Sequence, residues 1–345
     1  MGATAIEWTG SPLTRALVLR RALRLEGDVT LEAGTYPAGH VLPGFTFNGW
    51  KGCEKLSPAC KHCYAESWAK RCGYTPDGKH HLTLWGPAAT TPRERTSAEY
   101  WKRPLRWNRI AAELGVRLKV FAFSLADVGE DHPMVGPWRE EFFGLIDRTP
   151  DLTWLLLTKR PAHLASVWPK AWSGRANLPR NVWVGTTAED QHYAAERVPA
   201  LVEINAAEHF LSLELLLGPI DLACDVGQWE TNIGDFPRRL WDCPRCCGTG
   251  YFQVDPYVVA CSRCALSAQA MKGTGVGVSW VIIGGESGGG CRAMDLRALD
   301  SIAKRCVAAH VPVFVKQDSG LHPGMQGRLP ADLWALKQWP QSGAA

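Results

Sequence analysis

The chain has 345 residues, of which 46% are hydrophobic and 21% charged, and its formal net charge is +4. Such a composition predicts a globular protein of one large domain or two smaller ones, and the mild charge permits an anionic partner without indicating one. No apolar run has the length of a membrane span and the first residues lack a signal-peptide pattern, so we expect a cytoplasmic protein with no membrane partner.

Short apolar runs alternate with amphipathic segments along most of the chain. Residues 12–25 have helical spacing, and residues 28–42 indicate a small strand-and-turn unit. The predicted strands are Phe45–Trp50, Leu118–Phe123, Thr153–Leu157, Val182–Val184, His209–Leu213, Trp280–Ile283 and Val311–Val315. The helices predicted between them include Pro137–Arg148, Gln191–Ile204 and Leu296–Ala309. This alternation is typical of parallel strands joined by right-handed crossovers.

We expect an α/β fold, a partial or complete β/α (TIM-like) barrel of six to seven parallel strands. A doubly wound open sheet is the rival. Polar residues follow each of the predicted strands, as a barrel that builds one site at its carboxyl rim requires. An open sheet would need such residues only at its switch point, and the pattern therefore favours the barrel.

Two pairs of cysteines interrupt this alternation. Cys243 and Cys246 form one C-x2-C pair, Cys261 and Cys264 form another, and fourteen residues separate them. Four thiolates complete a tetrahedral Zn2+ shell, so residues 225–277 are predicted to be an inserted zinc ribbon. The predicted organisation is an N-terminal segment 1–44, a first barrel part 45–224, the ribbon 225–277, and a last barrel part with the tail 278–345.

Cys53, Cys60 and Cys63 form a second cysteine motif, with C-x6-C-x2-C spacing, after the first predicted strand. Three thiolates leave one position of a metal or of a four-iron cluster open to a ligand from outside the protein. The alternative is a second zinc site completed by His62, Cys72 or Cys291. The position of the motif at the barrel rim, and the presence of a separate zinc ribbon, favour an iron–sulfur cluster.

Other candidate site residues are those that the barrel would place at its rim. They are Ser124, Asp127, Lys159, Arg160, Glu214, Gly284, Gly285, Glu286, Lys316 and Gln317. Glycines let the backbone approach a ligand, and the Glu286 carboxylate could bind an ammonium group or ribose hydroxyls. Lys159 and Arg160 could hold a phosphate. Structural ion pairs at strand ends are the alternative. Residues 85–109 interleave arginines with tryptophans, which suits nucleic-acid binding, but an amphipathic helix with core tryptophans is favoured.

Several segments resemble the bacteriophage Gp-thirty-seven/Gp-sixty-eight family, a family of radical-SAM-like proteins. They are Ile6–Thr9, Asn48–Cys53, Ser57–Glu66, Leu156–Pro161, Leu216–Asp221, Ile283–Gly288 and Phe314–Gln317. Residues 10–44 interrupt the family pattern, and the cysteine loop is three residues longer than the usual C-x3-C-x2-C. The resemblance implies a 4Fe-4S cluster on Cys53, Cys60 and Cys63, and S-adenosyl-L-methionine held with the help of Glu286 and its glycines, Ser124 and Glu214.

The resemblance implies a radical SAM enzyme that takes an electron from a donor, cleaves S-adenosylmethionine and begins radical chemistry on a substrate. By analogy with phage proteins the substrate class would be nucleic acid or a nucleotide, encountered in the host cytoplasm. Two alternatives come from other classes of protein. One is a non-catalytic zinc-binding module that binds nucleic acid or protein, and the other is an iron–sulfur protein of electron transfer or redox sensing.

Overall fold

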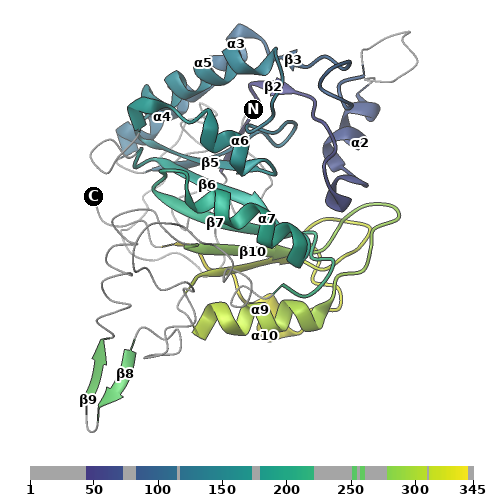
Figure 1. The fold of residues 1–345 in the computed structure, drawn as a ribbon, viewed down its shortest axis with the longest axis vertical. Coiled ribbons are helices and arrows are strands. Elements are labelled where there is room, and N and C mark those ends of the chain that lie inside the picture. The colour runs from purple at the N-terminus through teal and green to yellow at the C-terminus, as the bar shows by residue number, and fades with distance from the viewer. Residues whose placement is uncertain are drawn as a thin grey trace, which may run out of the picture. The chain divides into compact units, whose positions relative to one another are not determined.

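A seven-stranded sheet runs through the part of the chain that the computed structural model describes (Figure 1). The described residues are 44–72, 83–114, 117–172, 179–220, 251–254, 257–260, 278–308 and 311–340. The sheet strands are β1 (Phe45–Phe47), β4 (Leu118–Ala122), β5 (Leu152–Thr158), β6 (Val182–Thr187), β7 (Glu208–Glu214), β10 (Trp280–Gly284) and β11 (Val313–Gln317). Each predicted strand is confirmed, except that Phe45–Trp50 divides into β1 and the separate strand β2 (Trp50–Lys51).

The order of strands in the sheet is β1-β4-β5-β6-β7-β10-β11, and the pairings of β1 with β4, β4 with β5, β7 with β10 and β10 with β11 are parallel. Each strand therefore lies beside the sheet strand that precedes it in the chain. A doubly wound sheet would reverse its order at a switch point, so this order is that of a β/α barrel. Among the described strands β1 and β11 are the two edges, which makes the barrel a partial one.

Described helices lie between most of the consecutive sheet strands, as parallel pairing requires, although none lies between β7 and β10 and α10 follows the last strand. They are α2 (Tyr64–Arg71), α3 (Ala98–Trp101), α4 (Arg103–Leu114), α5 (Val135–Asp147), α6 (Pro161–Ser166), α7 (Gln191–Val202), α9 (Leu296–Ala308) and α10 (Ala331–Trp334), with 3-10 turns at Pro58–Cys60 and Lys170–Trp172. Every residue of β6 and β10 is buried. Strands that are covered on both faces have continuous apolar sequences, and the strands were predicted from such apolar runs.

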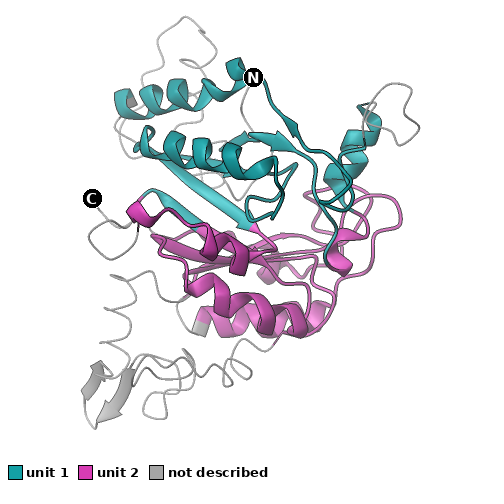
Figure 2. Cartoon of the chain, turned by 45° about the horizontal axis from the view of Figure 1, so that its top comes forward, with its two compact units in different colours: residues 1–56, 63–157, 181–183 teal, residues 57–62, 158–180, 184–345 magenta. Residues whose placement is uncertain are grey.

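The chain divides into two compact units (Figure 2). Unit 1 comprises residues 1–56, 63–157 and 181–183, and unit 2 comprises residues 57–62, 158–180 and 184–345. The division falls twice within the cysteine segment, as we call residues 53–63: Cys53 and Cys63 belong to unit 1 and Cys60 belongs to unit 2.

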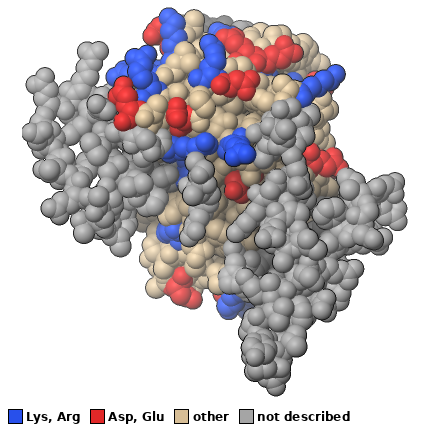
Figure 3. All heavy atoms as spheres, turned by 90° about the vertical axis from the view of Figure 1, so that its left-hand side faces the viewer, with Lys and Arg blue, Asp and Glu red and all other residues tan. Residues whose placement is uncertain are grey.

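The tryptophans of the basic segment 85–109 are core residues. Trp101 and Trp107 are buried, whereas Lys102, Arg106 and Arg109 are exposed. Trp101 donates a hydrogen bond from Nε1 to the Gly49 carbonyl at 3.2 Å. On the face drawn in Figure 3, Lys and Arg side chains lie interspersed with Asp and Glu. The buried rings cannot stack on bases, so α3 and α4 agree with the amphipathic-helix interpretation. Residues 85–97 contain no helix, however, and Arg93 is buried, so the interpretation is wrong for that part of the segment.

Two short antiparallel pairs accompany the sheet. β2 pairs with β3 (Glu94–Arg95), and β8 (Tyr251–Val254) pairs with β9 (Tyr257–Ala260). The β8–β9 hairpin lies in sequence between the two C-x2-C pairs. The four cysteines of these pairs, Cys243, Cys246, Cys261 and Cys264, lie outside the described residues, so the zinc ribbon stays a prediction. Residues 1–43, with the predicted helix at 12–25, also lie outside them. No helix of the described residues is both long and apolar enough to cross a bilayer.

Candidate functional site

The residue directly before the cysteine segment is a glycine that no other residue could easily replace. Gly52 follows β2 with a φ of 106°, and a Cβ atom at this position would lie 2.5 Å from the Leu84 carbonyl oxygen and 2.8 Å from Arg93 Cδ. The absence of a side chain lets Cys53 donate its N–H to the Leu84 carbonyl at 3.1 Å and accept from Gly86 N at 3.2 Å. Gly52 therefore fixes where Cys53 lies against residues 84–86.

Two of the three predicted ligands, both in unit 1, border the same small apolar cluster. Ala65, Ala69, Leu84 and Trp85 form its buried part, and Cys53, Cys63, Trp68 and Leu125 pack around it. Cys63 precedes α2 as its N-cap. Both cysteines are half-buried, and neither forms a disulfide. Folding thus brings two thiols to one cluster, although the chain separates them by most of the cysteine segment.

Glu66 joins helix α2 to the cysteine segment. Its Oε2 lies 2.6 Å from Lys55 Nζ, and its Oε1 lies 3.0 Å from Lys70 Nζ. Burial alone would raise the pKa of Glu66, but the hydrogen bonds and charges of the two lysines outweigh it and the pKa is lowered. The carboxylate stays ionised and holds Lys55 beside the helix that Cys63 begins.

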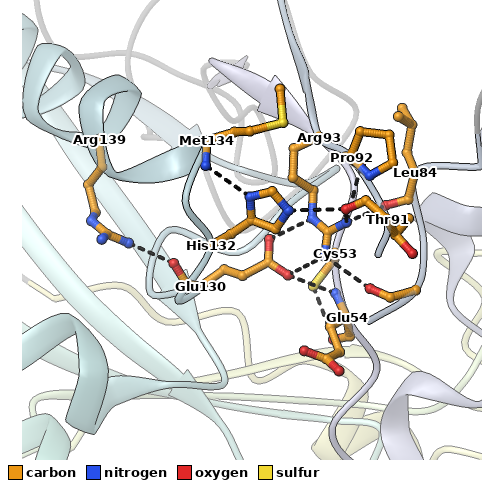
Figure 4. A network of polar contacts seen from close by, with 11 residues as sticks. Cys53, Glu54, Leu84, Thr91, Pro92, Arg93, Glu130, His132, Met134 and Arg139 are labelled. Atoms are coloured by element: carbon orange, nitrogen blue, oxygen red, sulfur yellow. Dashed lines mark hydrogen bonds and ion pairs between the residues drawn. The ribbon is translucent and has the colours of Figure 1, made fainter. Parts of the chain in front are cut away.

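A buried ion pair contacts the cysteine segment next to Cys53 (Figure 4). Arg93 donates from Nε to Glu130 Oε2 at 2.9 Å and from Nη2 to Oε1 at 2.8 Å, and both side chains are at most 1% exposed. Glu130 Oε1 also accepts the backbone N–H of Glu54 at 2.9 Å. The remaining guanidinium donors contact the carbonyls of Leu84, Gly86, Thr91 and Pro92. The pair is fully hydrogen-bonded, as a buried pair must be to persist.

The loop that carries Glu130 is fixed by two further buried side chains. Arg139 donates from Nη1 to the Glu130 carbonyl at 2.8 Å and to the Val128 carbonyl at 3.1 Å. His132 Nδ1 accepts the Met134 N–H at 3.1 Å, so its proton is on Nε2, which donates to the Thr91 carbonyl at 3.0 Å. Two backbone groups thus hold the His132 ring, and Figure 4 shows it beside the Arg93–Glu130 pair.

Ser124 and Asp127, two predicted site residues, lie in the loop after β4. Ser124 Oγ accepts from Asn48 Nδ2 at 3.1 Å, and the Ser124 carbonyl accepts from the exposed Tyr64 hydroxyl at 2.7 Å. Asp127 is buried, and its Oδ1 accepts the Gly129 N–H at 2.9 Å. Phe123, between β4 and Ser124, has a φ of 64°. This conformation is rare for a bulky residue, and such strain is typical of functional sites.

Unit 2 holds the middle of the cysteine segment. The 3-10 turn Pro58–Cys60 contains the third predicted ligand, and Cys60 Sγ lies 3.9 Å from Ser57 Oγ. The Ala59 N–H, next to Cys60, donates to Glu189 Oε1 at 3.4 Å. Glu189 is fully buried after β6, and its Oε2 lies 3.1 Å from Arg197 Nη1 of α7.

Glu286, at the end of β10, pairs with Arg292 and contacts the cysteine segment. Arg292 donates from Nη2 to Oε1 at 2.8 Å, and to Oε2 from Nε at 3.1 Å and from its backbone N at 2.8 Å. His62 Nδ1 lies 3.2 Å from Oε2. Burial alone would raise the pKa of Glu286, but the hydrogen bonds from Arg292 and His62 outweigh it and lower the pKa to about 2. The predicted cofactor-binding carboxylate is therefore ionised, and protein groups contact both of its oxygens.

Gly284 and Gly285 each lie against residues of neighbouring strand ends. A Cβ atom on Gly284 would lie 3.4 Å from both Glu214 Cγ and Lys316 Cβ. A Cβ atom on Gly285 would overlap the backbone N of Ser319, so this position requires glycine. The two glycines thus allow β7, β10 and β11 to end side by side.

Glu214 and Lys316 form an ion pair beside Gly284. Lys316 Nζ donates to Glu214 Oε2 at 2.8 Å, and the two side chains are 24% and 21% exposed, respectively. Glu214 Oε1 is buried and makes no hydrogen bond to the residues that the structure describes. This pair differs from Glu286–Arg292 in having an acceptor that remains available. Its opposite charges could bind the two charged ends of a zwitterionic ligand.

The other predicted residues at this rim make structural contacts. Gln317 donates from Nε2 to the Gly285 carbonyl at 2.8 Å and accepts from Gly324 N at 2.9 Å. Lys159 is half-buried directly after β5, and the Arg160 backbone N–H donates to Thr158 Oγ1 at 2.9 Å. Lys159 therefore lies at the rim as predicted.

Sequence reasoning missed the arginine partners. Arg197 and Arg292 were not singled out, and Arg93 was noted only as part of a basic segment. Arg93 and Arg197 lie in other segments than the acids that they contact, and Arg292 lies beyond a turn from Glu286. No local spacing in the sequence therefore indicated these pairings. The signal available was the charge balance: acids at strand ends, buried by the predicted fold, each need a cationic partner.

The three cysteines are divided between the two units, and their use as one ligand set stays a prediction. In the part of the chain that the structure describes, no group of three or more His, Cys, Asp or Glu side chains is arranged as a metal site. Of the alternative ligands, Cys72 is exposed and Cys291 is half-buried, and His62 contacts Glu286. Burial raises the pKa of the Cys306 thiol to about 12, which suits a packing residue.

The fold and the site define an α/β protein with a parallel sheet in barrel order and a cysteine segment after its first strand. Residues 43–330 match the family described as "Protein of unknown function (DUF5131)", and the chain belongs to this family. Comparison with curated proteins found no match, and neither did comparison with solved structures. The family description names no activity.

Proposed function

We propose that the protein is a radical-SAM-like iron–sulfur enzyme, in which Cys53, Cys60 and Cys63 bind a 4Fe-4S cluster. The observation that carries the proposal is the state of the three thiols. All three are half-buried thiols outside any disulfide, they follow β1 within one short segment, and two of them border one apolar cluster. Half-buried thiols outside disulfides suit a thiolate-ligated cluster, because such a cluster needs soft ligands and protection from water.

The donor set also fits the proposed cofactors by its chemistry. When bound, a cluster with an open iron would supply one electron to S-adenosylmethionine and begin radical chemistry. The protein's own residues would bind and orient. We assign the charged ends of S-adenosylmethionine to the Glu214–Lys316 pair, because Glu214 Oε1 is buried without a partner among the described residues and can accept from an ammonium group. The remaining residues proposed to lie around the cofactor are Ser124, Asp127, Lys159, Gly284, Gly285 and Glu286.

The proposed substrate class is nucleic acid or a nucleotide, for which Lys159 and Arg160 would supply cationic contacts to phosphate. A reducing partner would supply the electron, and the cytoplasm is the compartment that we propose for the protein. The predicted zinc ribbon at Cys243, Cys246, Cys261 and Cys264 would be an accessory element. A short antiparallel hairpin between its two cysteine pairs supports that part of the proposal.

A second candidate function is a non-catalytic binding module with two zinc sites. The observation that favours it is the state of the rim acids. Glu130, Glu189 and Glu286 each pair with an arginine, as scaffold residues do, and none presents an unoccupied carboxylate. An iron–sulfur protein of electron transfer is a third, since it would need the cluster but not the Glu214–Lys316 pair.

Metal and sulfide analysis of protein purified without air separates these functions. A brown protein with about four irons and about four sulfides per chain supports a cluster, whereas a colourless protein with about two zinc ions supports the binding module. The protein with a cluster is then incubated with dithionite and S-adenosylmethionine. Formation of 5′-deoxyadenosine supports the enzyme, and its absence with nucleotide and nucleic-acid substrates supports electron transfer. The variant Cys60→Ser should lose both the iron and the product.

A further inference from the structure

We propose that Glu130, Glu189 and Glu286 are positioning residues of the cysteine segment, each fixing one point of residues 53–63 while an arginine neutralises its charge. The identity of the metal rests on the proposed function, but the positioning does not. Glu286 would thus lie near the cofactor and orient the segment without binding the cofactor itself. The three ion pairs lie on different elements, and the carboxylate of each contacts the same short segment.

The first point is next to Cys53. Glu130 Oε1 accepts the N–H of Glu54 at 2.9 Å, while Arg93 contacts both oxygens of the carboxylate, at 2.8 and 2.9 Å. The acceptor is 1% exposed, so water cannot replace it. A hydrogen bond to a charged acceptor in such surroundings is strong and directional. It fixes the backbone directly after the first thiol.

The second point is next to Cys60. Glu189 divides its two oxygens between the segment and its partner: Oε1 accepts from Ala59 N at 3.4 Å, and Oε2 lies 3.1 Å from Arg197 Nη1. Arg197 is itself fixed by a 2.7 Å hydrogen bond to the Thr187 carbonyl. Groups of β6 and α7 therefore orient the Glu189 carboxylate independently of the cysteine segment. The hydrogen bond from Ala59 N is the longest of the three contacts between a carboxylate and the segment, so we expect it to be the weakest.

The third point is His62, between Cys60 and Cys63. Its Nδ1 lies 3.2 Å from Glu286 Oε2, and three donors of Arg292 hold that carboxylate. Both oxygens of Glu286 thus contact protein groups, and the side chain is only 7% exposed. An ammonium group of a cofactor would have to displace one of these contacts. Positioning of His62 is the role that the existing contacts fulfil.

The arrangement has a physical purpose for a thiolate site. Three thiolates brought together repel one another, and a flexible segment would also lose conformational entropy when metal binds. Fixing the backbone in advance removes part of that cost. Bare carboxylates would add to the repulsion, whereas carboxylates paired with arginines supply acceptors with little net charge. Groups that orient metal ligands in this way commonly change metal affinity about 10- to 100-fold when they are removed.

The test is a titration of the full-length apoprotein with Co2+. Binding is measured by the absorption of the cobalt–thiolate charge-transfer band. The signal of a variant with Cys53, Cys60 and Cys63 all changed to serine is subtracted, which removes binding at the other cysteines. Glu130→Gln, Glu189→Gln and Glu286→Gln are compared with Asp318→Asn. Asp318 is a matched control because it is 1% exposed and paired with Arg328 at 2.7 Å, like the three acids, and its hydrogen bonds reach no residue of the segment.

We expect Glu130→Gln and Glu286→Gln to weaken Co2+ binding about tenfold or more, and Glu189→Gln by less, whereas Asp318→Asn leaves it within about threefold. The alanine variants should bind more weakly than the glutamine variants, since glutamine keeps one acceptor oxygen. Circular dichroism confirms that each variant is folded. Where Glu130→Gln unfolds, the double variant Arg93→Met/Glu130→Leu replaces the pair by apolar groups and still removes the acceptor for Glu54 N.

Equal Co2+ affinity in the three acid variants and Asp318→Asn would overturn the positioning role, even if the wild-type protein binds metal. A wild-type titration that matches the triple serine variant would instead contradict the proposed cysteine site. The two failures are therefore distinct. Unchanged affinity in folded Arg93→Met/Glu130→Leu would overturn the role of Glu130 by itself.

Discussion

Arg93 and Glu130 form a buried two-point ion pair, with distances of 2.9 Å from Nε to Oε2 and 2.8 Å from Nη2 to Oε1. The two residues are 37 positions apart in the chain and join the segment before β3 to the loop after β4. Because Glu130 also accepts from Glu54 N, the pair links the core of unit 1 to the cysteine segment. We therefore expect loss of the pair to lower the free energy of unfolding as well as to disturb the cysteine segment.

Replacing only the arginine should be strongly destabilising. Arg93→Met leaves an uncompensated carboxylate at Glu130, and breaking a buried pair in this way costs about 3–5 kcal/mol. The double variant Arg93→Met/Glu130→Leu should recover most of that loss, because no buried charge remains. Urea denaturation of the wild type, both single variants and the double variant measures the coupling. A double variant as unstable as Arg93→Met would show that the guanidinium acts mainly through its backbone contacts.

Gly52→Ala should disturb the cysteine segment directly. Gly52 has a φ of 106°, and a Cβ atom would approach the Leu84 carbonyl to 2.5 Å. Strain of this kind costs about 1–3 kcal/mol, and the backbone around Cys53 must shift to relieve it. Gly144→Ala is the control: inside α5 a Cβ atom at this position meets nothing within 4 Å, and alanine should stabilise the helix by up to about 1 kcal/mol. Thermal unfolding of the two variants should move in opposite directions.

Much of the fold was predictable because its signals are local. β5, β6 and β10 are short apolar runs, α7 and α9 are amphipathic, and parallel strands joined by helices permit few topologies. The polar residues after each strand also indicated barrel order over a doubly wound order. These features depend on neighbours in sequence, and a single chain displays them.

The contacts within the site were less predictable because they depend on distant residues. Glu286 looks in sequence like an acid open to a ligand, but Arg292 and His62 hold it, and the latter is 224 positions away. The need for glycine at residue 52 likewise comes from Leu84 and Arg93. Glu214 and Lys316 were both expected at the rim, and their ion pair follows from the register of β7, β10 and β11. Residue type therefore indicated where charges would lie but not how they would pair.

Acid should destabilise the wild-type protein partly through Glu286. Its pKa in the folded protein is about 2, below the ordinary value of 4.5, so its stabilising contribution is complete above pH 4.5 and is lost as pH falls from 4.5 towards 2. The difference corresponds to at most about 3 kcal/mol, and solvent screening at the partly exposed Arg292 reduces it. Urea unfolding at pH 6 and pH 3 should show a smaller acid loss in Glu286→Gln than in the wild type. Equal losses would mean that Asp318 and Glu66, whose pKa values are also lowered, dominate the acid response.

Lys119 should destabilise the protein below about pH 8. It lies on β4 with its Nζ 5.4 Å from the centre of the Trp183 ring, and burial lowers its pKa from 10.5 to about 8. The unfolded chain therefore holds the proton more tightly between these values, and wild-type stability should rise as pH increases from 8 to 10.5. Lys119→Met keeps most of the volume and removes the buried charge. At pH 6 it should therefore be more stable than the wild type, in which the buried ammonium is charged. The gain should disappear near pH 10.5. A gain that does not change with pH would mean that better packing, and not the removal of a buried charge, is responsible.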